Sequence, residues 1–134
     1  MRIARAGFIS VAVFMVLSST PASAWAGGEW YSVRSNDRNW RGHASSIAFF
    51  NPDGEHLKVC DEREDGKRAY ARLTWRDSNG TRRYATIEAA GDRNCNKRNL
   101  DIGEDKSATL TACGKDLDVS GHKLLDCNSK SVRT

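Results

Sequence analysis

The sequence predicts a small all-β protein: a disulfide-stapled antiparallel β-sandwich, immunoglobulin-like, or a compact barrel. Three observations support this fold class. Short segments of alternating apolar and polar residues recur between turn residues. No stretch beyond residue 24 shows the apolar period of a helix. Four cysteines follow an apolar N-terminus, a combination typical of exported proteins, whose small domains often depend on disulfides.

Residues 1–24 are interpreted as a cleavable secretory signal peptide. Arg2 and Arg5 precede an apolar run over residues 6–17, and Ala22-Ser23-Ala24 has the small-residue pattern of a cleavage site. The run is shorter than the ~20 residues that span a bilayer, so no membrane span is expected after cleavage. The secreted product loses both arginines from a formal net charge of +4, and this mild basicity makes nucleic acid an unlikely partner.

The rest of the chain has the length of one domain. Residues 25–45 are interpreted as a Trp-rich arm, because they hold three of the four tryptophans among glycine, serine and arginine without a regular period. Residues 46–128 form the predicted β-sandwich domain. Residues 129–134 are expected to be a polar tail, since chain ends fray unless they are tied down.

The expected strands are separated by turns and polar loops. The Asn-Pro-Asp-Gly turn at residues 51–54 divides the first two, and a polar, cationic loop is expected over residues 91–99. Each strand shows alternation or an apolar run. The expected strands cover residues 47–50, 56–60, 69–76, 83–89, 107–113 and 123–127.

The clearest element is a β-hairpin over residues 69–89. One side of its first strand carries alanines, Leu73 and Trp75, and Trp75 is assigned to the core. Residues 77–80 then turn the chain, because an Asn-Gly pair tolerates positive φ. In the return strand Ala85, Ile87 and Ala89 are expected to face the same side as Leu73.

The four cysteines, Cys60, Cys95, Cys113 and Cys127, allow three pairings. The local pattern, Cys60–Cys95 with Cys113–Cys127, is preferred, and the 15-residue loop of the second bridge suggests about 3 kcal/mol from chain entropy. A Cys60–Cys113 bridge between two sheets stays open as the alternative. No C-x-x-C pair occurs, so no zinc site is expected, and no metal or other cofactor is predicted.

Several short motifs lie in sequence order along residues 46–128. They are Pro52-x-Gly54, Leu57-x-Val59-Cys60-Asp61, Asp65-Gly66, a late Cys113 and a closing Asp126-Cys127. In these features the chain resembles the small secreted four-cysteine all-β proteins of actinomycete-type bacteria. The resemblance implies a secreted β-sandwich-like domain and no particular activity, and it does not extend to the Trp-rich arm.

The polar side of the predicted hairpin is the main candidate site. Arginines interleaved with tyrosines can hold anionic groups and stack on rings, although arginines also protect a soluble sheet from aggregation. Exposed tryptophans in the arm either pack over the end of the sandwich or stack on a ligand such as a sugar. The candidate binding residues are Tyr70, Arg72, Arg76, Arg82, Tyr84, Trp30 and Trp40.

Three functions are considered. The first is a secreted, non-catalytic binding domain of unknown ligand, whose extracellular partner is an anionic cell-wall polymer or a secreted protein. The second is a small inhibitor or antimicrobial effector that uses the loop closed by Cys113–Cys127, with Lys115, Leu117 and Val119 in it. The third is a secreted nuclease, for which a general base and a phosphate-binding arginine are needed. The residues considered for that role are His56, Glu88 and Arg72.

The acidic loop at residues 61–66 was compared with a calcium loop. Arg63 stands at the third position and Arg72 at the twelfth, where the EF-hand pattern requires oxygen ligands. A looser site formed by Asp61, Glu64 and Asp65 is weighed against a solvated charged loop, and the solvated loop is preferred.

Overall fold

A computed structural model describes residues 29–37, 42–91, 93–117 and 123–134, and these residues form eight strands and no helix. The strands pair into two antiparallel four-stranded sheets, ordered β1-β2-β3-β6 and β5-β4-β7-β8. Their bounds are β1 Tyr31–Arg34, β2 Ser46–Asn51, β3 His56–Asp61, β4 Arg68–Arg76, β5 Arg82–Ala89, β6 Cys95–Asn99, β7 Ser107–Lys115 and β8 Leu124–Arg133.

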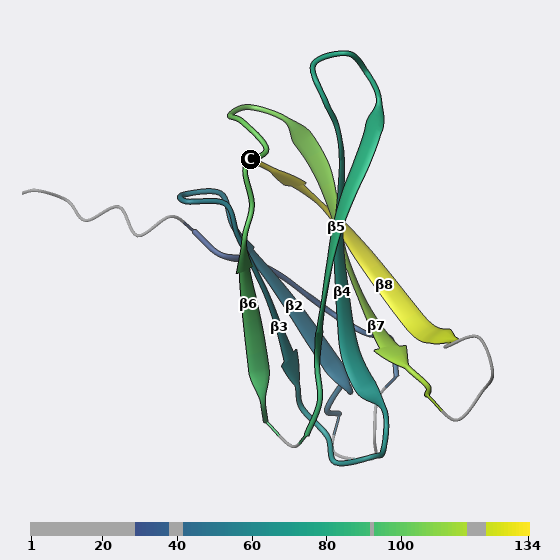
Figure 1. The fold of residues 1–134 in the computed structure, drawn as a ribbon. Coiled ribbons are helices and arrows are strands. Elements are labelled where there is room, and N and C mark those ends of the chain that lie inside the picture. Colours follow the sequence, from purple (N-terminus) through teal and green to yellow (C-terminus); the bar gives the residue numbers. More distant parts are fainter. Residues whose placement is uncertain (1–28, 38–41, 92, 118–122) are drawn as a thin grey trace, which may run out of the picture.

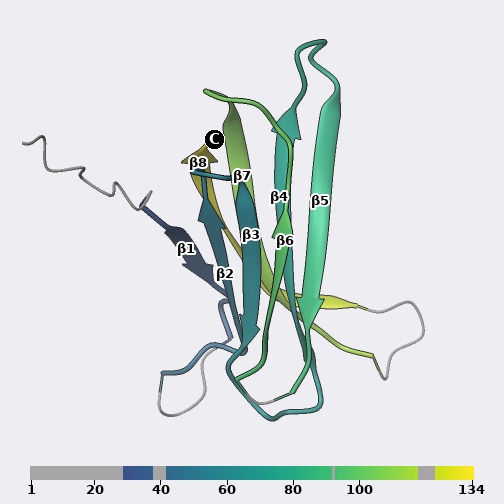
Figure 2. The ribbon, with the colours of Figure 1, turned by 60° about the vertical axis from the view of Figure 1, so that its left-hand side comes forward.

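The two sheets pack face to face and enclose one apolar core, as Figures 1 and 2 show. Phe50, Leu57 and Val59 enter it from the first sheet, and Leu73 and Leu110 enter it from the second, all fully buried. The arrangement is sandwich-like and the sheets do not close into a barrel. The predicted all-β fold is therefore confirmed, and the barrel alternative does not apply.

The predicted hairpin is confirmed as β4 and β5. Ala69, Ala71 and Leu73 are fully buried, Ala85 and Ala89 nearly so, and Trp75 and Ile87 pack against the same core. Of the Asn79-Gly80 pair only Gly80 has a positive φ, and its amide donates to the Asp77 carbonyl to close the turn. Because successive side chains of a strand point to opposite faces, the residues between these inward ones point outward from β4 and β5.

Both preferred disulfides are present. Cys60–Cys95 joins β3 to β6 at positions directly opposite in the ladder, and Cys113–Cys127 joins β7 to β8 beside an irregularity in their pairing. The alternative Cys60–Cys113 bridge is excluded, because each cysteine is bonded within its own sheet.

The expected loop over residues 91–99 is wrong in its second half. Cys95–Asn99 is strand β6, which pairs with β3 over its whole length. All five of its residues are exposed, so no apolar alternation marked it in the sequence. Backbone pairing and the disulfide to Cys60 hold it in the sheet.

Both ends of the predicted β domain extend further than expected. Within the supposed arm, Tyr31–Arg34 forms β1 and extends the first sheet beside β2. Within the supposed polar tail, β8 continues to Arg133, and Val132 and Thr134 are buried. The predicted signal peptide, residues 1–24, lies outside the described residues, as do Trp25 and Trp40.

Side-chain amides and a guanidinium close the two open sides between the sheets. Asn96 and Arg98 of β6 donate to backbone carbonyls of β5, at 2.5 and 3.2 Å. On the opposite side Asn36 donates to the Cys127 carbonyl at 2.9 Å, and Asn128 donates to the Arg34 carbonyl at 3.0 Å. In the described part of the chain, no helix is long and apolar enough to cross a membrane.

Candidate functional site: a basic groove across the second sheet

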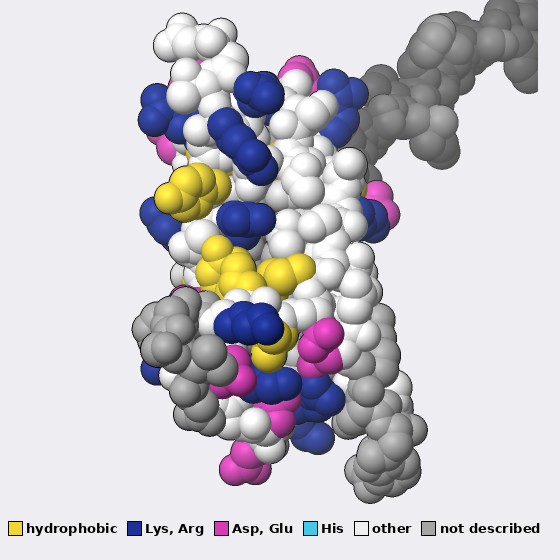
Figure 3. Space-filling view, turned by 90° about the vertical axis from the view of Figure 1, so that its right-hand side faces the viewer, with side chains coloured by type: hydrophobic (Ala, Val, Ile, Leu, Met, Phe, Trp, Pro, Cys, Tyr) yellow, Lys and Arg dark blue, Asp and Glu magenta, His cyan; other side chains and the backbone are white. Residues whose placement is uncertain are grey.

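The outer face of the second sheet brings together five of the seven predicted binding residues. Tyr70, Arg72 and Arg76 project from β4, and Arg82 and Tyr84 project from β5. The register places Arg76 directly opposite Arg82. Figure 3 views the molecule from this side, where Lys and Arg side chains alternate with hydrophobic ones and acidic side chains gather mostly toward one end.

Two adjoining hollows cross this face. The first, about 310 Å³, is lined by Arg72, Thr74, Arg82 and Tyr84. The second, about 450 Å³, shares Thr74 and Arg82 with the first. It adds Trp75, Arg76, Lys106, Ser107 and Thr109.

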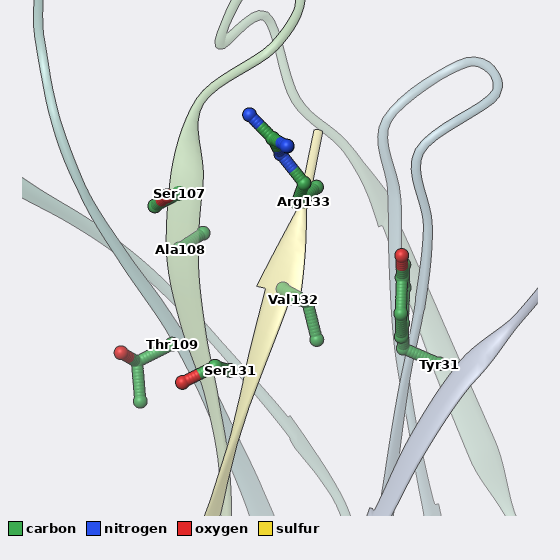
Figure 4. Close-up of a pocket in the computed structure, with 7 residues that line it drawn as sticks. All are labelled: Tyr31, Ser107, Ala108, Thr109, Ser131, Val132 and Arg133. Carbon is green, nitrogen blue, oxygen red and sulfur yellow. The ribbon is translucent and has the colours of Figure 1, made fainter.

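A third hollow, about 310 Å³, is also lined by Tyr31, Ala108 and Val132, so it opens on the inward side of β7 and β8 and not on this face. Figure 4 shows Ser107, Thr109 and Ser131 on one side of β8, while Tyr31 lies on the other side. On the outward side the first two hollows make one shallow depression over β5, β4 and β7. The register continues this surface to Ser131 and Arg133 of β8, and we name the whole surface the cross-strand groove.

The floor of the cross-strand groove is a row of four residues in register. Tyr84 lies opposite Thr74, Thr74 lies opposite Thr109, and Thr109 lies opposite Ser131. Tyr84 is 71% exposed, although tyrosine normally buries much of its ring. The described residues form no hydrogen bond with the side-chain hydroxyls of Thr74, Thr109 and Ser131. The floor therefore offers one open ring and three free hydroxyls.

Arginines flank this row on both sides. Arg76 and Arg82 lie on one side with Arg133, and Arg72 lies on the other. Within the described residues, none of these four guanidinium groups forms an ion pair with a carboxylate. Elsewhere on the same sheet Arg68 and Lys115 pair with Glu88, and Arg83 pairs with Asp77, while Lys130 lies over the Tyr31 ring. Arg76 donates to the Gly80 carbonyl at 2.8 Å, but no carboxylate of the described residues neutralises the positive charge of the groove.

Burial affects two side chains beside the groove, the guanidinium of Arg72 and the hydroxyl of Tyr70. The Nε of Arg72 is buried and has no hydrogen-bond partner in the described residues. Burial raises the pKa of the Tyr70 hydroxyl, against the opposing effect of the Arg72 and Lys115 charges. Tyr70 is therefore a neutral hydrogen-bond donor at neutral pH.

Trp30 does not join this site. It precedes β1 in the first sheet, is 42% exposed, and meets Phe49 edge to face at 6.5 Å between ring centroids. The Lys58 ammonium lies 5.4 Å from the centroid of the same Phe49 ring. Of the seven predicted residues, five therefore lie on the second sheet and Trp30 lies beside the first, while Trp40 is outside the described residues.

The β7–β8 half of the groove was not predicted from the sequence. Ser107 and Thr109 show the alternation of an outward strand face, which in principle identifies them. Ser131 and Arg133 were assigned to the tail, because the end of β8 is almost wholly polar and only Val132 marks its inward side.

The structure does not assemble the nuclease trio. His56 lies at the start of β3 in the first sheet, and its Nδ1 is 2.7 Å from the Asn99 side-chain oxygen. Glu88 and Arg72 belong to the outer face of the second sheet, and Glu88 pairs with Lys115 and Arg68. The histidine considered as a general base and the arginine considered for binding phosphate are therefore on different sheets.

The acidic loop is held by hydrogen bonds and ion pairs within the protein. Arg63 pairs with Asp37 and, at 3.4 Å, with Asp65, and the Arg63 amide donates to Asp61 at 3.1 Å. No group of three metal-ligating side chains gathers in the described residues. Arg63 neutralises part of the loop as expected, but Asp61 is buried and not solvated.

The loop proposed for an inhibitor lies only partly within the described residues. Lys115 is engaged by Glu88. Leu117 lines a hollow of about 310 Å³ beside the acidic loop, and Val119 lies outside the described residues.

The fold and the site together define a small, disulfide-bonded, two-sheet β protein with a basic groove across one sheet. No family model matches the chain, and searches of curated proteins and of solved structures gave no match. The function is therefore argued from the groove itself.

Proposed function

We propose that this protein is a secreted, non-catalytic binding domain that holds an anionic ligand in the cross-strand groove. The observation that carries the proposal is the set of four arginines on one sheet face without carboxylate partners in the described residues, while Arg68, Lys115 and Arg83 of the same sheet are each paired. Uncompensated arginines lower the free energy of bound carboxylate, sulfate or phosphate groups.

Secretion rests on two further observations. The predicted signal peptide directs export. Both disulfides join neighbouring strands, and such bridges persist in oxidising compartments. An extracellular domain meets anionic polymers of the cell surface before it meets nucleic acid, which agrees with a surface polymer as the partner.

The test is binding of the purified secreted protein to insoluble cell-envelope material. We expect the protein to be retained, and the Arg72→Ala/Arg82→Ala variant to be retained about tenfold less, a loss near 1.4 kcal/mol. Lys58→Ala/Lys97→Ala is the matched control, because it removes the same charge from directly opposed positions on the outer face of the first sheet. Equal retention of the two variants would remove the groove from the proposed role.

A further inference from the structure

We infer that the ligand of the cross-strand groove is an acidic glycan, whose sugar hydroxyls lie on the groove floor and whose anionic groups meet the flanking arginines. This inference rests on the proposed function and narrows it to one chemical class. It follows from the order of the residues across the sheet, which charge alone does not explain.

The floor has the chemistry that sugar rings require. Hydroxyl groups both donate and accept, so Thr74, Thr109 and Ser131 can each complement a sugar hydroxyl. Tyr84 stands at one end of their row with an exposed ring, which can cover the apolar face of a sugar. The neighbouring row differs, because the hydroxyls of Thr111 and Ser129 are already 2.8 Å apart and bonded to each other.

The spacing of charge argues against a nucleic-acid duplex. Three inter-strand steps separate β5 from β8, so the floor is roughly 14 Å long. Each strand of a duplex places about four phosphates over that length of its axis, at ~3.4 Å each. The β7 section of the floor offers hydroxyls, and the arginines nearest to it lie on β4 and β8. A polymer with anionic groups separated by hydroxyl-bearing units fits this pattern better.

The aromatic content supports the same choice. Proteins that bind single strands without sequence preference stack successive bases on several aromatic side chains. Within the described residues, Tyr84 is the only strongly exposed aromatic side chain on this face, because Trp75 is packed against the core and Tyr70 is half-buried. One ring serves one sugar at the end of the groove.

The experiment separates hydroxyl recognition from charge. Dissociation constants are measured for tetragalacturonate, digalacturonate, maltotetraose and a short thymidine oligonucleotide. We expect tetragalacturonate to bind at least about tenfold more tightly than each of the other three. The variant Thr74→Val/Thr109→Val keeps every charge and nearly the same shape, and we expect it to weaken tetragalacturonate about tenfold while oligonucleotide binding stays unchanged.

The matched control is Thr111→Val, which removes a hydroxyl from the bonded row and should leave tetragalacturonate binding unchanged. If the oligonucleotide or maltotetraose binds as well as tetragalacturonate, or if the valine variant affects all anions alike, the glycan assignment is wrong. If Arg72→Ala/Arg82→Ala changes the binding of no anion, the proposed function itself fails. The two failures are therefore distinguishable.

Discussion

At the scale of the residue, Arg72 combines a cost to stability with the role in binding that we propose for it. Its Nε is buried without a partner, and an unsatisfied buried donor costs about 1–3 kcal/mol. Proteins keep such groups where function needs them, because binding sites violate the packing rules that the rest of the fold obeys. Arg72 is in that position, since its charge borders the groove floor.

Replacing Arg72 by methionine separates these two effects. Methionine keeps the packing of the aliphatic stem and removes the unsatisfied donor. We expect Arg72→Met to raise the free energy of unfolding by about 1 kcal/mol and to weaken binding of cell-envelope material several-fold. Urea denaturation and the retention assay measure the two quantities. A variant that is less stable than the wild type contradicts the prediction.

A second residue-scale prediction concerns Asp37 at one end of the sheets. Burial opposes its ionisation, but hydrogen bonds from Ser35 and Ser45 and the charge of Arg63 outweigh burial and lower the pKa of Asp37. A carboxyl whose pKa is lower in the folded state stabilises the fold above its unfolded pKa of ~3.9. That contribution is lost as the pH falls from about 4 through the lower, folded-state pKa.

The variant Asp37→Asn should therefore be less stable at neutral pH, by about 1–3 kcal/mol, because the partners of Asp37 lose a charged acceptor. The difference from the wild type should shrink as the pH falls from about 4 through the lowered folded-state pKa of Asp37, because the wild-type carboxyl then becomes protonated as well. Urea denaturation from neutral pH down through this range gives the comparison. Asp101→Asn, at an exposed position, serves as the control and should show no such convergence.

At the scale of the element, β6 is held by means other than apolar burial. All its residues are exposed, and it depends on the ladder to β3, the Cys60–Cys95 bridge and two side-chain bonds to β5. We expect Cys60→Ser/Cys95→Ser to lower the free energy of unfolding by about 3–4 kcal/mol. Amide hydrogen exchange should accelerate most in β6. Uniform acceleration over both sheets would show that β6 is not an independent weak point.

The end of β8 is a second element whose contribution to stability cannot be recognised from the sequence. Val132 is buried, and Thr134 exchanges backbone hydrogen bonds with the loop before β7 while its hydroxyl bonds Gly103 and Lys106. Deleting residues 131–134 should cost at least about 2 kcal/mol, from lost apolar burial and several hydrogen bonds. Thermal unfolding measures the loss. Unchanged stability would support the original expectation of a loose tail.

These elements show which parts of the fold the sequence can predict. The hairpin was predicted because Leu73 and its alternating alanines mark an inward face, and Cys113–Cys127 joins strands that are neighbours in the chain. The Cys60–Cys95 bridge was preferred from the order of the cysteines alone, since it joins β3 to β6 across the β4–β5 hairpin. Strand β6 and the end of β8 were not, since their places come from pairing partners and not from their own pattern. For the same reason the β4–β5 half of the groove was predicted and the Ser131–Arg133 half was not.

At the scale of the whole molecule, binding should depend strongly on salt although the net charge is small. The formal net charge of the chain is +4, but five cations line one groove: Arg72, Arg76, Arg82, Lys106 and Arg133. Exposed charges are screened within roughly 10 Å at 0.1 M salt. Raising NaCl from about 50 to about 500 mM should weaken polyanion binding at least tenfold, with a smaller effect on Arg72→Ala/Arg82→Ala. Lys58→Ala/Lys97→Ala should keep the wild-type salt dependence.

The side chains of Asn96, Arg98, Asn36 and Asn128 occupy backbone carbonyls that an incoming foreign strand would need. Unprotected strand borders invite polymerisation into fibrils. These hydrogen bonds therefore protect the strand edges from aggregation, which matters for a secreted protein because intracellular chaperones cannot assist it. The double change Asn96→Ala/Arg98→Ala should make concentrated solutions bind amyloid dyes within days, while the parent protein stays clear.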